Sequence, residues 1–301
     1  MDAILRIEDL VAEFVTTDGT VSAINHVTLS LRRGSTLAIT GESGSGKTSL
    51  GLSVLNLLPH PGRIISGSIY FEGRDLLEME PDSLRAVRGR DIAMVFQDPA
   101  SGLNPVLAVG QQVEEIITTH LDVSKNEAQR RSVEVLAETG LPDAAEICKR
   151  YPYELSGGMA QRVMIAMALA CVPELLIADE PTTALDVTIQ AQILDLMRNL
   201  RTKMDTAIIL ITHDLGVVAE MCDRVDVMYA GRIVEKAPVV ELFQNPKHPY
   251  TAALIGSTPV LGEANKELTT IPGSVPNLIN LPLGCKFAPR CEARIEHNLE
   301  K

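Results

Sequence analysis

The stretch ITGESGSGKTSL, residues 39–50, decides the fold of this chain. Within it, Gly41-Glu42-Ser43-Gly44-Ser45-Gly46-Lys47-Thr48 fits the P-loop pattern of a glycine, four residues and then Gly-Lys-Thr. The glycines allow a tight turn close to phosphate oxygens, and successive backbone N–H groups form an anion-binding nest. By itself, the pattern predicts a site for nucleotide phosphates and nothing narrower.

The residues on both sides of the loop support that prediction. Residues 35–40, STLAIT, are typical of a buried strand, and residues 49–58 predict a helix whose N-terminal end attracts anions. We expect Lys47 to reach the β- and γ-phosphates and the Thr48 hydroxyl to ligate Mg²⁺. Strand, loop and helix in this order predict an α/β P-loop fold.

The length and composition of the chain limit the classes of protein to which it can belong. The 301 residues, 46% of them hydrophobic, suffice for one large domain or two modest ones. A formal net charge of −12 argues against a nucleic-acid partner. No apolar run approaches the roughly 18 residues that span a bilayer, and the acidic start MDAILRIEDL does not resemble a signal peptide. We expect a soluble cytoplasmic protein that reaches the membrane only through partners.

An antiparallel β layer is predicted ahead of the P-loop. Residues 4–14 and 21–31 read as strands, and Asp18-Gly19 is a hairpin turn signal. Phe14 allows two interpretations. It is a candidate platform for the adenine ring of ATP, or it is a core phenylalanine of its strand, which its spacing alone favours.

Two predicted strands end in polar side chains of the kind a nucleotide site needs. Residues 91–96 lead to Gln97, which can contact Mg²⁺ or orient water, or can be an ordinary loop residue. Residues 175–178 run directly into Asp179 and Glu180. Asp179 fits the Mg²⁺-associated aspartate of P-loop NTPases, and Glu180 is placed to polarise an attacking water.

A third buried strand, residues 207–212, leads to His213. A single histidine is usually structural. Because it ends a core strand, as the three polar residues above do, a γ-phosphate contact is the favoured interpretation here.

A helical insertion is predicted between Gln97 and the strand at 175–178. Residues 109–119 and 126–139 show helical spacing. Ser124 is a candidate N-cap with Glu127 completing a capping box, and Gly140 ends the helix.

The chain contains a second motif that attracts anions. Ser156-Gly157-Gly158 stands at the start of a predicted helix, where the backbone N–H groups are unsatisfied. Further along, residues 183–186 predict a tight turn, and Asp186 predicts the cap of a helix over residues 187–200.

Together these motifs resemble the ATP-binding subunit of an ABC transporter, in the order and spacing of that family, over about residues 1–240. Within the family, three stretches resemble the dipeptide/oligopeptide importer ATPases: VFQDPASGLNPV, LSGGMAQRVMIAMALAC and DEPTTALDVTIQAQIL. In the region 241–301, NPKHPYTAALIGSTP, PGSVPNL and GCKFAPRC resemble the C-terminal extension of the same subfamily. The resemblance implies an α/β P-loop NTPase with a RecA-like core, an antiparallel β subdomain, a helical signature subdomain at about residues 98–172 and a short C-terminal extension.

The resemblance also implies a mechanism and partners. Two cassettes pack head to tail, and each ATP lies between the P-loop of one chain and Ser156–Gly158 of the other. Asp186 belongs to the same ATP site. The implied enzyme is an ATP- and Mg²⁺-dependent translocase subunit at the cytoplasmic face of the cell membrane, importing peptides; close relatives carry nickel or oligosaccharides. The implied partners are an identical or paralogous ATPase chain, two permeases and an extracytoplasmic solute-binding protein.

Two features depart from the family pattern. Met159 follows the signature where the wider family has glutamine. Members of this subfamily often carry four cysteines in the tail, in some cases around an iron–sulfur centre, but here only Cys285 and Cys291 are present. Two thiolates do not meet the usual requirement for four ligands. A truncated tail, an absent site and other ligands all remain open.

Two other classes of protein are less consistent with the sequence. ABC ATPases of DNA repair or translation usually have long coiled coils or two cassettes, and this chain has neither. A P-loop kinase or a switch GTPase would lack the LSGG segment, and the chain has no Asn-Lys-x-Asp stretch for reading guanine.

Overall fold

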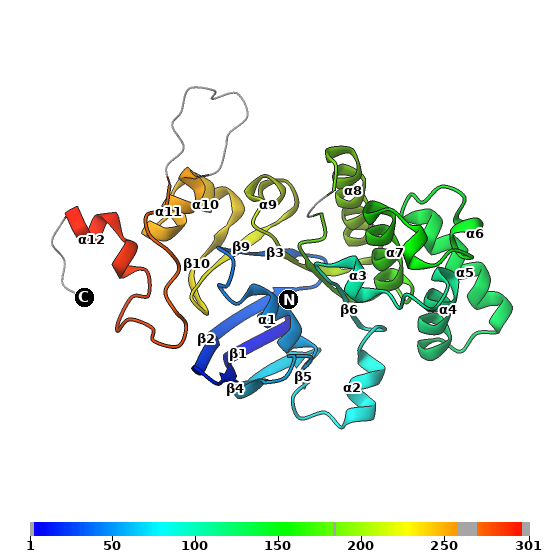
Figure 1. The fold of residues 1–301 in the computed structure, drawn as a ribbon, viewed down its shortest axis with the longest axis horizontal. Helices are drawn as coiled ribbons and strands as arrows, with labels where there is room; N and C mark the ends of the chain where they lie inside the picture. Colours follow the sequence, from blue (N-terminus) through cyan, green and yellow to red (C-terminus); the bar gives the residue numbers. More distant parts are fainter. Residues whose placement is uncertain (1–2, 183–184, 258–269, 297–301) are drawn as a thin grey trace. The chain divides into compact units, whose positions relative to one another are not determined.

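The computed structural model describes residues 3–182, 185–257 and 270–296 (Figure 1). Its elements divide between two compact units. The first consists mainly of residues 78–210, and the second of residues 5–31, 36–77 and 211 onwards. None of the described helices is long and apolar enough to cross a membrane.

The second unit contains the predicted antiparallel layer, with strand order β2-β1-β4-β5. Its strands are β1 (Ala3–Thr16), β2 (Gly19–Arg32), β4 (Gly62–Phe71) and β5 (Arg74–Asp75). In β1 and β4, Leu5 pairs with Phe71 and Phe14 with Gly62. Leu5 and Ile7 are fully buried on the inner face of β1, as the alternating pattern requires.

The same unit contains the strand that leads into the P-loop. All five residues of β3 (Thr36–Thr40) are buried, and β3 pairs in parallel with β9 (Arg224–Tyr229), which pairs antiparallel with β10 (Arg232–Pro238). The helices α1 (Lys47–Val54) and α9 (Leu215–Met221) follow in this unit. The predicted extension of α1 to residue 58 is wrong, because Asn56 takes a positive φ of 49° that ends the helical conformation.

The first unit contains the predicted helical insertion. The strands β6 (Ile92–Val95) and β7 (Leu175–Asp179) run parallel, and β8 (Ala207–Ile211) lies beside β7. Between β6 and β7 lie α3 (Pro99–Gly102), α4 (Val109–His120), α5 (Lys125–Glu138), α6 (Ala144–Ile147), η1 (Pro152–Glu154) and α7 (Gly157–Leu169). The helix α2 (Pro81–Val87) precedes β6, and α8 (Val187–Met204) follows β7. Ser124 caps α5 as predicted, because its Oγ accepts the Glu127 N–H at 3.3 Å.

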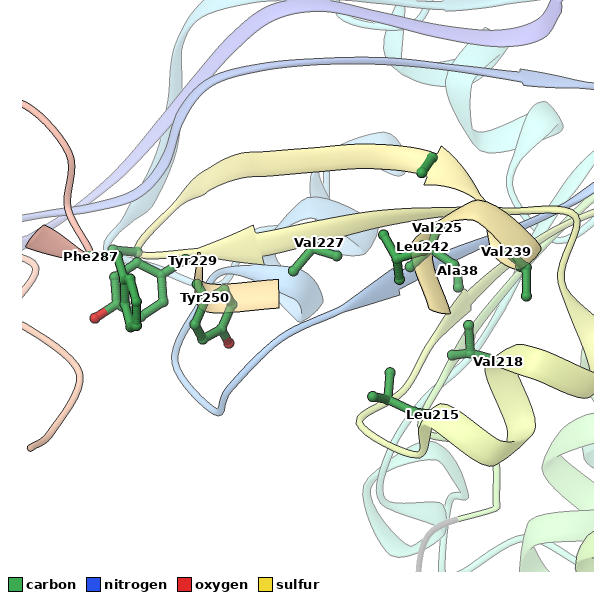
Figure 2. Packing of buried hydrophobic residues seen from close by; sticks show 12 residues of the cluster. Ala38, Leu215, Val218, Val225, Val227, Tyr229, Val239, Leu242, Tyr250 and Phe287 are labelled. Carbon is green, nitrogen blue, oxygen red and sulfur yellow. The ribbon is translucent and has the colours of Figure 1, made fainter. Parts of the chain in front are cut away.

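The described C-terminal residues of the second unit, 239–257 and 270–296, include the short helices α10 (Val239–Gln244), α11 (Pro249–Gly256), η2 (Ala288–Arg290) and α12 (Glu292–Glu296). Figure 2 shows part of their packing on the core, with the rings of Tyr229, Tyr250 and Phe287 close together. The ring centroids of Tyr229 lie 4.6 Å from Tyr250 and 5.3 Å from Phe287. Aromatic packing at these distances is stabilising, so β9, α11 and η2 share one hydrophobic cluster.

Candidate functional site

The predicted site residues divide between the two units. The second unit holds Phe14, Gly41, Glu42, Ser43, Gly44, Ser45, Gly46, Lys47, Thr48, His213, Cys285 and Cys291. The first unit holds Gln97, Ser156, Gly157, Gly158, Asp179, Glu180 and Asp186.

The P-loop requires glycine at two positions for both conformation and space. Gly41 has a φ of 148° and Gly46 a φ of 101°, in the region that L side chains rarely adopt. A Cβ at Gly41 would lie 2.1 Å from the Met228 carbonyl oxygen, and one at Gly46 would lie 2.2 Å from that of Ala23. The loop is therefore fixed between the β layer and β9, with its backbone N–H groups set in a turn suited to phosphate.

Lys47 brings its charge to the centre of this loop. Its side chain is only 7% exposed, and Nζ donates to the carbonyl oxygens of Gly41 at 2.8 Å and Glu42 at 2.9 Å. The same residue begins α1, whose N-terminal end adds positive partial charge. A buried ammonium beside a helix N-terminus is suited to binding an anion with several negative oxygens.

His213 lies in the same unit as the P-loop. The N–H of the preceding Thr212 donates to the Ile39 carbonyl at 3.2 Å, so the chain passes β3 just before the histidine. Asp214 then caps α9, with Oδ1 accepting the N–H groups of Gly216 at 2.8 Å and Val217 at 3.2 Å. These contacts hold the backbone of His213 while its side chain remains exposed.

Phe14 is half-buried and covers the backbone of its cross-strand neighbour. A Cβ at Gly62 would lie 2.7 Å from the Phe14 ring. This packing is consistent with both interpretations of Phe14, since one face of a half-buried ring can stack on a base while the other packs on the strand.

In the first unit, the structure brings Gln97 and Glu180 together. Parallel pairing of β6 and β7 sets Val95 beside Ala178, and both candidates lie two residues beyond these positions. Gln97 Nε2 donates to Glu180 Oε2 at 2.8 Å. Glu180 also has a positive φ of 48°, which is uncommon for a residue with a side chain and costs conformational energy. A carboxylate that accepts a hydrogen bond from an amide, on a backbone in this uncommon conformation, is a candidate catalytic base.

Asp179 precedes Glu180 and is only 2% exposed. Its carboxylate, the Thr48 hydroxyl and the Gln97 amide are oxygen donors, the type that Mg²⁺ prefers. By donor chemistry, therefore, the candidate metal ligands fit magnesium.

The start of α7 provides the second candidate phosphate site. Ser156 is its N-cap, with Oγ accepting the Met159 N–H at 3.3 Å. A Cβ at Gly157 would meet nothing within 4 Å, and one at Gly158 would make only an ordinary 3.7 Å contact with Leu185. Glycine inside a helix costs about 0.5–1 kcal/mol relative to alanine. Since neither the packing of this unit nor a positive φ requires these glycines, they are suited to close approach by another group.

Asp186 caps α8 as predicted, because its Oδ1 accepts the N–H groups of Thr188 at 3.1 Å and Ile189 at 3.0 Å. The turn predicted at residues 183–186 begins outside the described residues.

The tail cysteines do not fit an iron–sulfur cluster. Cys285 is exposed and Cys291 is partly buried, and neither is in a disulfide. Among residues 3–182, 185–257 and 270–296, no three or more His, Cys, Asp or Glu side chains gather in a way that could hold a metal ion.

Sequence reasoning missed three residues that support the site. In the first unit, Gln161 of α7 is buried and donates to the Pro181 carbonyl at 2.8 Å, next to Glu180. In the second unit, Arg290 and Tyr250 both contact Glu42 of the P-loop. No local motif marks these residues, because their partners lie far away in the sequence.

Comparisons with known proteins agree with this geometry. The family described as ABC transporter matches residues 24–183, and the oligopeptide/dipeptide transporter C-terminal region matches residues 234–297. The oligopeptide transport ATP-binding protein OppD of Salmonella typhimurium is 50% identical over 98% of this chain and 88% of its own. The dipeptide transport ATP-binding protein DppD of Bacillus subtilis is 48% identical, also over 98% of this chain and 88% of its own. Among solved structures, the dimeric ATP-binding cassette MJ0796 bound to ADP and Pi is 26% identical, with a TM-score of 0.72 over 78% of this chain and 98% of that one.

Proposed function

This chain belongs to the ABC transporter family of ATP-binding proteins, and from that premise we propose that it hydrolyses ATP to drive peptide import as one of two cassettes. The P-loop geometry carries this proposal, because it fixes two glycines and a buried lysine in a nest for phosphate. Peptides are the proposed cargo because the relatives named above are oligopeptide and dipeptide transport proteins.

The proposed roles follow from the positions of the side chains. Lys47 and the backbone N–H groups from Gly41 to Gly46 bind the β- and γ-phosphates, and Phe14 stacks on the adenine ring. Thr48, Gln97 and Asp179 would hold Mg²⁺, which would supply positive charge to neutralise the phosphates.

The remaining residues are assigned to the chemical step and to the partner chain. Glu180, oriented by Gln97, accepts a proton from the attacking water, and His213 contacts the γ-phosphate. Ser156, Gly157 and Gly158 bind the ATP held by the second cassette, and Asp186 completes the same shared site. The open approach to Gly157 and Gly158 supports this arrangement.

The proposed assembly places this chain at the cytoplasmic face of the membrane. A second ATPase chain, identical or paralogous, would complete the two ATP sites, and two permeases would bind the pair. An extracytoplasmic solute-binding protein would deliver the peptide. We assign residues 1–240 to the cassette and residues 241–301 to the extension. Nickel or oligosaccharide cargo would appear as a different solute on the copurified binding protein.

Replacing Lys47 tests the ATP assignment directly. In Lys47→Ala the phosphates lose their point-charge partner, so ATP affinity and hydrolysis should fall by about 100-fold or more. Lys203→Ala removes an exposed lysine near the end of α8 and is the matched control. Unchanged ATP binding and turnover in Lys47→Ala would remove the P-loop assignment.

A further inference from the structure

One residue of the C-terminal extension is bound to the P-loop. Arg290, in η2, is 6% exposed, and its guanidinium forms a two-pronged ion pair with the carboxylate of Glu42. Nη1 lies 2.7 Å from Oε2 and Nη2 lies 3.1 Å from Oε1. Nε donates to the Pro272 carbonyl at 2.7 Å, and Nη1 also donates to the Tyr229 hydroxyl at 3.3 Å. All three nitrogens of the guanidinium are therefore engaged, which fixes the plane of the group.

Glu42 is held by its backbone as well as by its side chain. Its N–H donates to the Tyr250 hydroxyl at 2.8 Å, and its carbonyl accepts the Lys47 ammonium at 2.9 Å. Tyr250 is fully buried in α11, and burial raises the pKa of its hydroxyl. The second residue of the phosphate-binding loop is thus anchored at three points, two of them supplied by residues after position 241.

The aromatic cluster keeps these anchors in place. Phe287 packs against both of the other rings, 5.3 Å from Tyr229 and 5.3 Å from Tyr250, and those two rings lie 4.6 Å apart (Figure 2). The Arg290 guanidinium lies 5.9 Å from the ring centroids of both Tyr229 and Phe287. Such packing and cation–π contacts disfavour other positions of the arginine.

The ion pair matters because Glu42 is an acidic residue in a loop that binds anions. An uncompensated carboxylate in the loop would repel a triphosphate, and the partial burial of the Glu42 side chain, which is 26% exposed, reduces the screening of that repulsion by water. Arg290 neutralises this charge and draws the side chain to η2. We propose that Arg290 is a positioning residue for ATP, which makes the C-terminal extension part of the nucleotide site. This proposal rests on the ATP function proposed above.

Binding measurements on the full chain test the proposal. The probe is the non-hydrolysable ATP analogue AMP-PNP with Mg²⁺, and its affinity is measured by calorimetry. The thermal midpoint of unfolding is measured for the same chains, so that loss of folding is distinguished from loss of binding. Arg290→Met keeps the apolar stem but leaves Glu42 uncompensated, so the dissociation constant should rise about ten-fold or more. Arg294→Met is the control in the same extension, where Nη1 donates to the Ala288 carbonyl; its affinity should stay within about two-fold of wild type.

A second substitution separates charge compensation from a merely structural role. Adding Glu42→Gln to Arg290→Met removes the repelling carboxylate, so most of the lost affinity should return although the ion pair is still absent. Unchanged affinity in Arg290→Met, or a further loss in the double variant, would overturn the proposal. If Arg290→Met does not fold, Tyr250→Phe provides the test, because it removes the hydroxyl that accepts the Glu42 N–H. This variant should bind the analogue several-fold more weakly, and unchanged binding would also overturn the proposal. A wild-type chain that does not bind the analogue would instead refute the ATP function itself.

Discussion

At the scale of single residues, the proposed hydrolysis chemistry rests on the contact between Gln97 and Glu180. Glu180→Gln should keep nucleotide affinity, because the new amide oxygen can still accept the Gln97 N–H that lies 2.8 Å away. It cannot accept a proton from water, so hydrolysis should fall by about 100-fold or more. Turnover and nucleotide affinity, measured on the same preparation, check this expectation.

Glu174→Gln is the matched control for that experiment. It makes the same change at the residue just before β7, where Glu174 forms a partly exposed ion pair with Arg33. Its turnover should resemble that of wild type. A Glu180→Gln chain that hydrolyses ATP at the rate of the control would exclude Glu180 as the base.

The residues of the candidate site differ in how far sequence could predict them. Lys47 and the P-loop glycines are recognisable locally, because the motif is continuous and each residue type has a physical reason. Gln97 and Glu180 could be placed at strand ends, but their contact depends on the parallel register of β6 and β7. The Arg290–Glu42 pair spans 248 positions and arises only when the chain folds.

At the scale of elements, a buried carboxylate in β9 makes a prediction about stability. Asp226 is fully buried, and burial raises its pKa from an ordinary value of 3.8 to about 6. Arg224, whose Nε lies 3.3 Å from Oδ1, and Lys236 offset only part of this cost. The pKa of Asp226 is higher in the folded chain than in the unfolded chain, so protonation of this carboxyl stabilises the fold. This stabilisation is fully present below about pH 4 and is lost as the pH rises through about 6.

Asp226→Asn should therefore be more stable than wild type at pH 7.5, with the cost of the buried charge, at most about 3 kcal/mol, removed. Denaturant unfolding of both chains at several pH values measures the difference. The difference should shrink between pH 6 and pH 4, since wild type then carries a neutral carboxyl. A variant less stable than wild type at pH 7.5 would show that Arg224 and Lys236 outweigh the burial of the charge.

Most elements were predictable from sequence, and the exceptions have physical causes. The apolar runs at 36–40, 175–179 and 207–211 are buried strands, as their patterns indicated. The end of α1 was placed too late, because hydrophobic spacing continues past Asn56 while its backbone does not. The packing of η2 against β9 could not be predicted, because a short helix in a proline-rich tail carries no periodic signal.

At the scale of the whole molecule, the proposed assembly requires two chains for each ATP site. The start of α7 presents an N-cap serine and two glycines that neither positive φ nor close packing within the first unit requires. A group outside the chain would use them, which is the role assigned to the ATP of a second cassette. Substitutions at Ser156 should consequently affect assembly without affecting the chain's own nucleotide.

Ser124 provides a control matched in geometry. It caps α5 with the same 3.3 Å hydrogen bond to the N–H three residues on that Ser156 makes at α7. Ser124→Arg and Ser156→Arg therefore lose equivalent caps, worth about 1 kcal/mol each, and gain the same side chain. A difference in dimerisation or hydrolysis between the two variants would therefore reflect the Ser156-Gly157-Gly158 motif and not the loss of a helix cap.

The most direct test is the ATP affinity of the isolated Ser156→Arg chain, measured beside its ATP-dependent dimerisation by analytical ultracentrifugation. If the ATP site is shared between chains, affinity should stay within about two-fold of wild type and of Ser124→Arg, with ATP-dependent dimers and hydrolysis lost only in Ser156→Arg. Loss of ATP affinity in the Ser156→Arg monomer would place the motif in its own chain's pocket and contradict the shared site.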